Sequence, residues 1–137
     1  MMVQYALPVL LARDMGEIRG KTRFQKLLYI IQKRYQESNP NKSFFAYEPY
    51  YYGPFSSELA QTIDELVDRG MLTQKSTTTA AGYTVVIYGL TPQGDEFLGK
   101  VAASKLLDQK ITAVVNDVAK NEGGMPLADL VAAAKAL

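Results

Sequence analysis

A single β-hairpin among segments of helical character is the feature that most constrains the fold of this chain. Residues 83–90 are rich in Val, Ile and Tyr, residues 71–76 form a shorter β-type segment, and small residues 77–82 lie between them. Two such segments with a short small-residue stretch between them are typical of a hairpin. The sequence therefore predicts an α+β, mostly helical architecture.

Helical segments precede the hairpin. A first helix is expected over residues 3–15, where it ends at Gly16, with Pro8 in its first turn or at a kink. Residues 17–21 are expected to be a connector, and a second helix follows over residues 23–37. This second helix has the clearest periodicity in the chain, and it provides most of the expected core.

The starts of the second and third helices are marked by capping residues. Thr22 is a suitable N-cap, and Gln25, three residues later, completes a capping box. A third helix is expected over residues 57–69, capped by Ser56 or Ser57. Five apolar residues of the second helix fall within one arc of about 100° and are the predicted core: Phe24, Leu27, Leu28, Ile31 and Tyr35.

Helical structure also follows the hairpin. Thr91 before Pro92 is a strong helix start, and one helix or more continues to about residue 120. Pro126 opens a last, alanine-rich helix to residue 137. At 137 residues, the chain has the length of one domain with a hydrophobic core.

Three helices, a hairpin and a further helix follow the order of a winged helix-turn-helix domain. We expect a single domain over residues 1–137, with a winged-helix core at 1–91 and a C-terminal helical extension at 92–137. One feature departs from the usual plan. The connection between the second and third helices is tyrosine-rich and about 18 residues long, whereas a helix-turn-helix turn has three or four.

Composition excludes most familiar catalytic chemistry. The chain has no Cys and no His, so disulfides, thiol nucleophiles, Cys/His zinc sites and imidazole-dependent triads are absent. The adjacent pairs Asp64-Glu65 and Asp95-Glu96 point about 100° apart on a helix and form no facing dyad. We expect a protein without enzymatic activity, metal, cofactor or small-molecule substrate.

The longest apolar run near the start of the chain does not predict a membrane segment. It covers residues 6–12 and is interrupted by Pro8, whereas a bilayer span needs roughly 20 residues. No basic stretch precedes it and no cleavage site follows it, so it is not typical of a signal peptide. A cytoplasmic protein without membrane contact is expected.

Basic residues concentrate in the first third of the chain. Residues 1–45 hold eight Lys and Arg against three Asp and Glu, a net charge of +5, whereas residues 46–100 hold three against seven, a net of −4. The basic face of the second helix is interpreted as a solvated surface, a phosphate-contacting stripe or one half of a complementary pair. The candidate contacts are Arg19, Lys21, Arg23, Lys26, Lys33 and Arg34.

The third helix is acidic, although it occupies the recognition position of a winged helix. Four carboxylates stand against the single Arg69, so this helix would repel DNA phosphates. It suits instead a basic surface, either in a homodimer or on a partner. The acidic residues are Glu58, Asp64, Glu65 and Asp68.

Seven aromatic rings lie within residues 44–55. In an extended chain Tyr50 and Tyr52 face one way and Tyr51 the other. Packing on the second helix is one interpretation, and a binding surface is the other, because exposed tyrosines occur at protein interfaces and stack on unpaired bases. The candidate interface joins the acidic third helix to Tyr47, Tyr50, Tyr51, Tyr52 and Phe55.

Two stretches carry a resemblance to a known family. Residues 20–30, GKTRFQKLLYI, resemble the LQKLLYI helix of the YwgA-like proteins and the related Panacea (SocA-like) antitoxin domains. Residues 52–59, YGPFSSEL, resemble their YGP-x-S-x-L stretch. The resemblance covers roughly residues 20–98, and it implies a winged-helix-like fold with a regulatory or antitoxin-like role.

These observations lead to two functional hypotheses. The first is a non-enzymatic protein-interaction module, antitoxin-like or adaptor, that binds a protein partner or itself as a homodimer. The alternative is a DNA-binding transcriptional regulator that contacts phosphates through the basic face of the second helix. The first is favoured because the acidic third helix opposes the usual mode of DNA binding.

Overall fold

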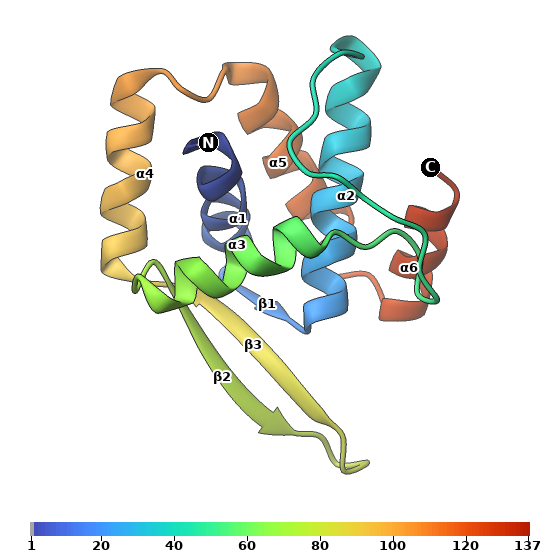
Figure 1. Cartoon of the computed structure of the whole chain (residues 1–137). Helices are drawn as coiled ribbons and strands as arrows, with labels where there is room; N and C mark the ends of the chain where they lie inside the picture. The colour runs from blue at the N-terminus through green and yellow to red at the C-terminus, as the bar shows by residue number, and fades with distance from the viewer. Residues whose placement is uncertain (1) are drawn as a thin grey trace.

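The computed structural model describes residues 2–137, which form six helices and three strands (Figure 1). This composition confirms the expected α+β, mostly helical class. In chain order the elements are α1 (Met2–Met15), β1 (Glu17–Arg19), α2 (Lys21–Ser38), α3 (Ser57–Asp68), β2 (Leu72–Thr78), β3 (Thr84–Leu90), α4 (Pro92–Ser104), α5 (Gln109–Asn121) and α6 (Leu127–Lys135).

Several predicted helix ends are confirmed by their capping contacts. The Ser56 hydroxyl accepts the Leu59 N–H at 3.0 Å, and the Thr91 hydroxyl accepts the Gly94 N–H at 2.9 Å. Pro8 lies inside α1 rather than in its first turn. These caps satisfy amides that have no acceptor within the helix, so they fix where α3 and α4 begin.

The predicted capping box at the start of the second helix is wrong. α2 follows Gly20, which has a φ of 100° and supplies no side-chain cap. Glycine reaches this φ without steric cost, and the Gly20 N–H donates to Val86 O at 2.7 Å. The helix therefore starts directly from the sheet, Thr22 lies within its first turn, and the Gln25 side chain is free for a different contact.

The expected connector at residues 17–21 contains a third strand that the sequence analysis missed. β1 pairs antiparallel with β3, so Ile18 lies opposite Tyr88 and the strand order is β1-β3-β2. Ile18 is fully buried, whereas its neighbours Glu17 and Arg19 are exposed. A strand of three residues, two of them charged, carries too little alternation to be predicted.

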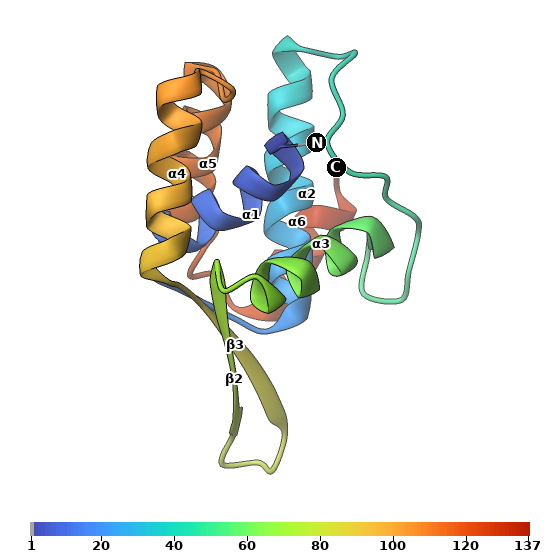
Figure 2. The same cartoon turned by 60° about the vertical axis from the view of Figure 1, so that its left-hand side comes forward.

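The predicted hairpin is confirmed, with a longer first strand, a slightly shorter second strand and a shorter tip. β2 and β3 pair from Leu72–Leu90 out to Thr78–Thr84. The hairpin projects away from the helices in both views (Figures 1 and 2). Apart from Leu72, every residue of β2 is exposed, so its outer part adds little to the core.

Residues 92–120 form two helices. α4 ends at Lys105, which has a left-handed conformation with a φ of 57°. α5 begins at Asp108, whose carboxylate accepts the Ile111 N–H at 2.8 Å. The same carboxylate accepts the Tyr35 hydroxyl at 2.6 Å, so the end of α2 is tied to the start of α5.

α2 is the central helix of the core. Residues 24–32 are all buried, and nine consecutive residues cover every direction around a helix. α5, α6 and β1 pack against it, and α3 crosses in front of it (Figure 1). The five predicted core residues of this helix are all buried, which confirms the apolar arc.

Two buried glutamines of α2 hold the connection between α2 and α3. The Gln32 carbonyl accepts the Phe44 and Phe45 N–H groups, both at 2.9 Å, and its amide donates to Phe45 O at 3.1 Å. The Gln25 amide donates to Ser56 O at 2.8 Å, and its carbonyl accepts the Ser56 N–H at 2.9 Å. These contacts satisfy backbone groups that have no strand partner.

Replacing Gln32 with Leu is expected to lower the free energy of unfolding by about 2–4 kcal/mol, because two buried backbone N–H groups lose their acceptor. Urea denaturation measures this change. Gln36→Leu is the matched control, since the Gln36 amide donates to Lys42 O at an exposed position. Equal losses in the two variants would contradict the role given to Gln32.

Tyr35→Phe is expected to lower the free energy of unfolding by about 1 kcal/mol at neutral pH. The Tyr35 hydroxyl, followed by the Ile111 N–H, lowers the pKa of Asp108 in the folded chain. The stabilisation by the ionised Asp108 carboxylate is therefore present above the pKa of about 3.9 in the unfolded chain. It is lost as the pH falls through the lower pKa of Asp108 in the folded chain.

The stability gap between the wild type and Tyr35→Phe should accordingly shrink below about pH 4. Urea denaturation across an acidic pH series tests this, with Tyr83→Phe at the exposed hairpin tip as the control. A gap that stays constant with pH would show that the Asp108 carboxylate does not carry the effect.

Candidate functional site

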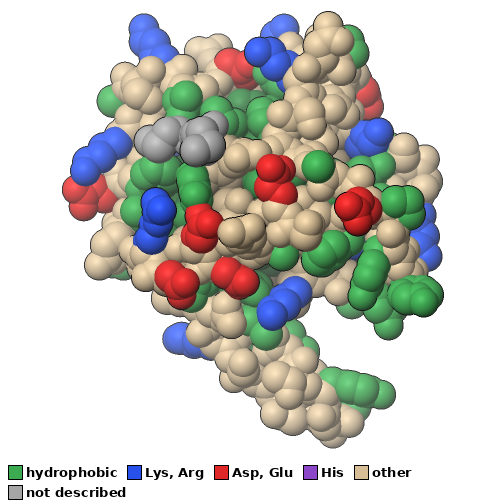
Figure 3. All heavy atoms as spheres, in the orientation of Figure 1, with side chains coloured by type: hydrophobic (Ala, Val, Ile, Leu, Met, Phe, Trp, Pro, Cys, Tyr) green, Lys and Arg blue, Asp and Glu red, His purple; other side chains and the backbone are tan. Residues whose placement is uncertain are grey.

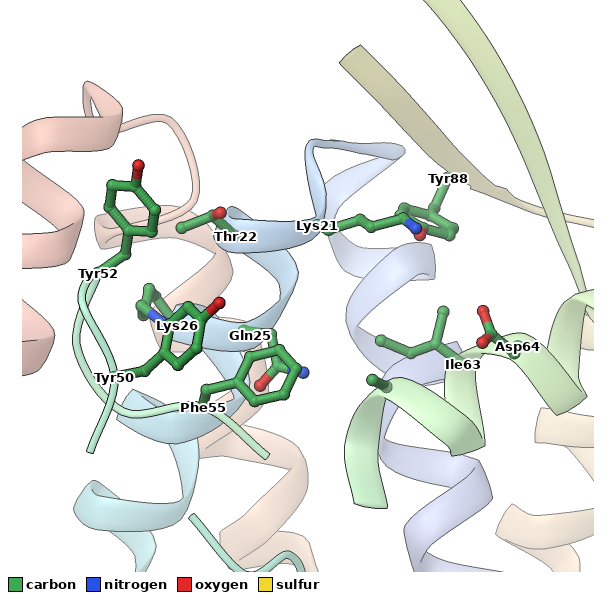
Figure 4. Close-up of a pocket in the computed structure, with 11 residues that line it drawn as sticks. Lys21, Thr22, Gln25, Lys26, Tyr50, Tyr52, Phe55, Ile63, Asp64 and Tyr88 are labelled. Carbon is green, nitrogen blue, oxygen red and sulfur yellow. The ribbon is translucent and has the colours of Figure 1, made fainter. Parts of the chain in front are cut away.

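A cleft of about 350 Å³ lies between α2, α3 and the connection that joins them. We call it the α2–α3 cleft. Figure 4 shows Tyr50, Tyr52 and Phe55 on one side, Ile63 and Asp64 on the other, and Lys21 beside Tyr88. The residues that line the cleft are Lys21, Thr22, Gln25, Lys26, Tyr50, Tyr52, Phe55, Ala60, Ile63, Asp64 and Tyr88.

The two stretches singled out in the sequence meet at this cleft. Residues 20–30 supply the start of α2, and residues 52–59 supply the loop and the first turn of α3. The paired hydrogen bonds between Gln25 and Ser56 join them, so Gln25 has a structural role across the cleft wall. The two stretches, which are about two dozen residues apart in the sequence, therefore form one site in the structure.

Lys26 is a buried cation in the wall of the cleft. It is 1% exposed, and its ammonium donates to Pro54 O at 2.7 Å. Within residues 2–137, no carboxylate lies within 4.0 Å of its Nζ. Burial lowers the pKa of Lys26, and the nearby Lys135 ammonium lowers it further. Buried charges are normally paired, so Lys26 is an exception that needs an explanation.

Residues 48–55 form a closed loop, which we call the tyrosine loop. Glu48 and Phe55 exchange two backbone hydrogen bonds of 2.8 and 2.9 Å, and the Gly53 N–H donates to Tyr50 O at 3.0 Å. The expected extended course of the tyrosines is therefore wrong, because the chain turns between Tyr50 and Gly53.

Gly53 is required at the tip of the tyrosine loop for two reasons. Its φ of 95° is rarely adopted by residues with a side chain. A Cβ at this position would also lie 3.3 Å from Lys135 Cγ and 3.4 Å from Lys26 Cε. The loop is thus seated tightly between the stems of two lysines.

Three consecutive tyrosines are exposed on the tyrosine loop. Tyr50, Tyr51 and Tyr52 are 57%, 86% and 62% exposed. Tyr50 and Tyr52 line the α2–α3 cleft, whereas Tyr51 is not among its lining residues. Figure 3 shows a group of hydrophobic side chains on the surface where the α2–α3 connection passes α6. An exposed aromatic patch of this kind marks an interaction surface.

Tyr47 and Phe55 differ from the three exposed tyrosines. Tyr47 was expected at an interface, but its ring packs edge to face on Tyr29 at 4.9 Å. Its hydroxyl is buried without a hydrogen-bond partner in the described chain, and burial raises its pKa. Phe55 is half-buried against the Tyr50 ring, 5.4 Å away. Tyr47 is therefore a packing residue, which corrects its assignment.

The four acidic residues of α3 divide into two groups. Glu58 accepts the Ala46 N–H at 3.2 Å, and Glu65 accepts a hydrogen bond from the Tyr5 hydroxyl, which raises the pKa of Tyr5. Asp64 and Asp68 are exposed, and Asp64 forms part of the cleft wall. Figure 3 shows carboxylates gathered on the surface over α3, so this face is acidic in space as well as in sequence.

Three of the four members of the expected basic stripe of the second helix have contacts within the chain. Arg23 donates to Gly123 O at 3.0 Å and to Met125 O at 2.7 Å. Arg34 forms two hydrogen bonds with Glu122, at 2.6 and 2.7 Å. Lys26 is buried, as described above. These cations are bound by their own chain, and those of Arg23 and Arg34 contact the segment between α5 and α6.

Two of the remaining basic candidates, Arg19 and Lys21, line one surface pocket together with Arg23, whereas Lys33 lies apart from them. Arg19 is exposed on β1 and lies 3.6 Å from Glu17. Lys21 is exposed at the rim of the cleft. The Lys33 ammonium lies 5.7 Å from the centre of the Tyr29 ring, twelve residues and about 18 Å along α2 from Lys21. Lys33 therefore does not share a contact surface with Arg19 and Lys21.

Two residues of this region were missed by the sequence analysis. Tyr88 of β3 is 2% exposed and lines the cleft, and its pKa is raised to about 12 by burial and by the Asp64 carboxylate. Lys135 of α6 packs against Gly53. Tyr88 stands in a recognisable strand, but no local signal connects Lys135 to a loop about 80 residues earlier.

Among residues 2–137, no helix is both long and apolar enough to cross a membrane. In the same residues, acidic side chains form no group of three or more that could hold a metal ion.

The fold and the cleft define the class of this protein as a mostly helical α+β chain with an aromatic and charged cleft. No family model matches the chain. It is 35% identical over 101 residues to the uncharacterized protein YwgA of Bacillus subtilis (strain 168). The aligned region is 72% of this chain and 55% of that protein, so the chain spans about half the length of its relative. This similarity confirms the YwgA-like resemblance.

Arg34→Ala is expected to lower the free energy of unfolding by about 1–3 kcal/mol, because the largely buried Glu122 carboxylate loses two charged hydrogen bonds. Lys33→Ala, the neighbouring control, should cost less than about 1 kcal/mol. Urea denaturation of Arg34→Ala, Glu122→Gln and the double variant gives their coupling free energy. A coupling near zero would mean that Arg34 is free for other contacts.

Proposed function

We propose that this chain is a non-enzymatic regulatory protein-interaction module, antitoxin-like or adaptor, that docks a partner protein on the tyrosine loop and the adjoining face of α3. The observation that carries the proposal is the exposure of Tyr50, Tyr51 and Tyr52 on a loop closed by backbone hydrogen bonds. A fixed loop presents large amphipathic rings with little loss of conformational entropy on binding.

The charge next to the loop suggests the chemistry of the partner. Asp64 and Asp68 are exposed on α3 and take part in none of the ion pairs of the described chain. A partner with an apolar centre and a basic rim complements both the rings and the carboxylates. A second copy of this chain is included, since a homodimer was expected from the segregated charges.

A winged-helix scaffold is part of the proposal. The order helix, strand, helix, helix, strand, strand over residues 2–90 and the antiparallel sheet β1-β3-β2 support it. The resemblance to Panacea (SocA-like) antitoxin domains supports the antitoxin-like role. The similarity to YwgA supports the relationship but adds no activity, since that protein is uncharacterized.

DNA binding through the basic face of α2 is the alternative, and the side-chain contacts weigh against it. Arg23 and Arg34 are engaged within the chain, Lys26 is buried, and α3 carries exposed carboxylates. Phosphate binding needs several free cations on one surface. A protein partner is therefore favoured over DNA.

Tyr51→Ser/Tyr52→Ser is expected to abolish binding of a partner protein, because the loop loses its two most exposed rings. Affinity capture from the native host identifies the partner, and titration of the purified pair gives its Kd. Tyr83→Ser is the matched control, since Tyr83 is 72% exposed on the hairpin tip. Light scattering of the chain alone tests self-association with the same variants.

DNA binding is tested by fluorescence anisotropy with a labelled random duplex at about 50 and 200 mM salt. We expect that the duplex shows no binding of the kind that weakens steeply between these two salt concentrations. Binding that falls steeply with salt and is lost in Lys21→Glu/Lys33→Glu would favour the regulator hypothesis. Arg34 is left unchanged in this test, because a change there also removes its pair with Glu122.

A further inference from the structure

The α2–α3 cleft contains positive charge that the fold does not balance. Lys26 in its wall has one carbonyl acceptor, Pro54 O, although an ammonium group has three donors. Lys21 stands at the rim, among the first residues of α2, where the helix has no side-chain cap and its amides add a partial positive charge. Asp64 is the one carboxylate among the lining residues.

The remaining walls of the cleft are aromatic. Tyr50 and Phe55 lie ring to ring at 5.4 Å on one side, and Tyr52 stands beside them (Figure 4). The volume of about 350 Å³ is near the lower end of small-ligand sites, which span about 300–1,000 Å³. It accommodates one planar ring with a small polar group.

We propose that the α2–α3 cleft binds a small organic anion, a carboxylate or phosphate monoester carried on a single planar ring. The acid group pairs with Lys26, and the ring packs against Tyr50, Tyr52 and Phe55. This inference goes beyond the proposed partner surface, because binding of a small molecule requires no partner protein.

The buried charge of Lys26 is the observation that selects an anion over a neutral or cationic ligand. An ionised acid beside it supplies the missing counter-charge at a place where solvent screens weakly. A cationic ligand would be repelled by the lysines of the cleft, and a neutral ring would leave the Lys26 ammonium without a counter-charge. The half-buried Lys33, on the same helix, lies outside the cleft.

The direct test is titration of the ¹⁵N-labelled protein, followed by NMR, with four probes: phenyl phosphate, benzoate, benzyl alcohol and inorganic phosphate. We expect one or both aromatic anions to shift the amides of Gln25 and Gly53. Benzyl alcohol should bind at least about tenfold more weakly, because it lacks the charge that pairs with lysine. The two anions compared with each other distinguish a carboxylate site from a phosphate site.

Lys26→Met removes the charge and keeps the length of the side chain. We expect it to weaken binding of the aromatic anion at least about tenfold while the protein stays folded. Lys33→Met is the matched control and should bind as the wild type does. If Lys26→Met fails to fold, Lys26→Gln takes its place, since a Gln amide also removes the charge and can still donate to Pro54 O, with the same expected direction.

Three results would overturn the proposal: no probe bound at millimolar concentration, benzyl alcohol bound as tightly as benzoate, or an unchanged anion affinity when the cleft lysine is replaced. Binding of inorganic phosphate alone would also overturn it, since the aromatic walls would then have no role. If the Tyr51→Ser/Tyr52→Ser variant still binds a partner, all of these measurements are unaffected. The two proposals are therefore tested separately.

Discussion

The buried polar side chains of α2 are the constraint on which the rest of this structure depends. The long connection between α2 and α3 has little secondary structure of its own, so its backbone groups need other partners. Gln25, Lys26 and Gln32 supply them, through contacts to Ser56, Pro54 and the Phe44–Phe45 pair. One helix therefore provides the apolar core and also positions the tyrosine loop.

The same helix also secures the C-terminal part of the chain. Arg23 and Arg34 bind the segment between α5 and α6, which explains why basic residues accumulate on α2 without forming a free surface. The outward-facing groups that remain near the cleft are the tyrosines and the carboxylates of α3. Because the polar residues of α2 make contacts within the fold, they help to determine the position of the candidate interface.

The limits of sequence analysis are clear from particular residues. The apolar arc of α2 and the caps at Ser56 and Thr91 depend on local periodicity and local hydrogen bonds, so they were predictable. The acceptors of Arg23 are main-chain carbonyls about 100 residues away, which no residue type reveals. Tyr47 and Tyr51 are the same residue type, so residue type alone does not distinguish them. Their positions relative to the turn of the loop decide that the Tyr47 ring is packed and the Tyr51 ring is exposed.

Lys26 connects the fold to both proposals. A methionine would fill the same space without the desolvation of a charge, so the single bond to Pro54 is a weak reason to keep a lysine here. It lines a cleft whose walls include Tyr50 and Tyr52, and these rings also belong to the exposed patch. An anion in the cleft and a protein on the loop would use the same two side chains. Binding of one must then change the affinity for the other by the same factor in both directions.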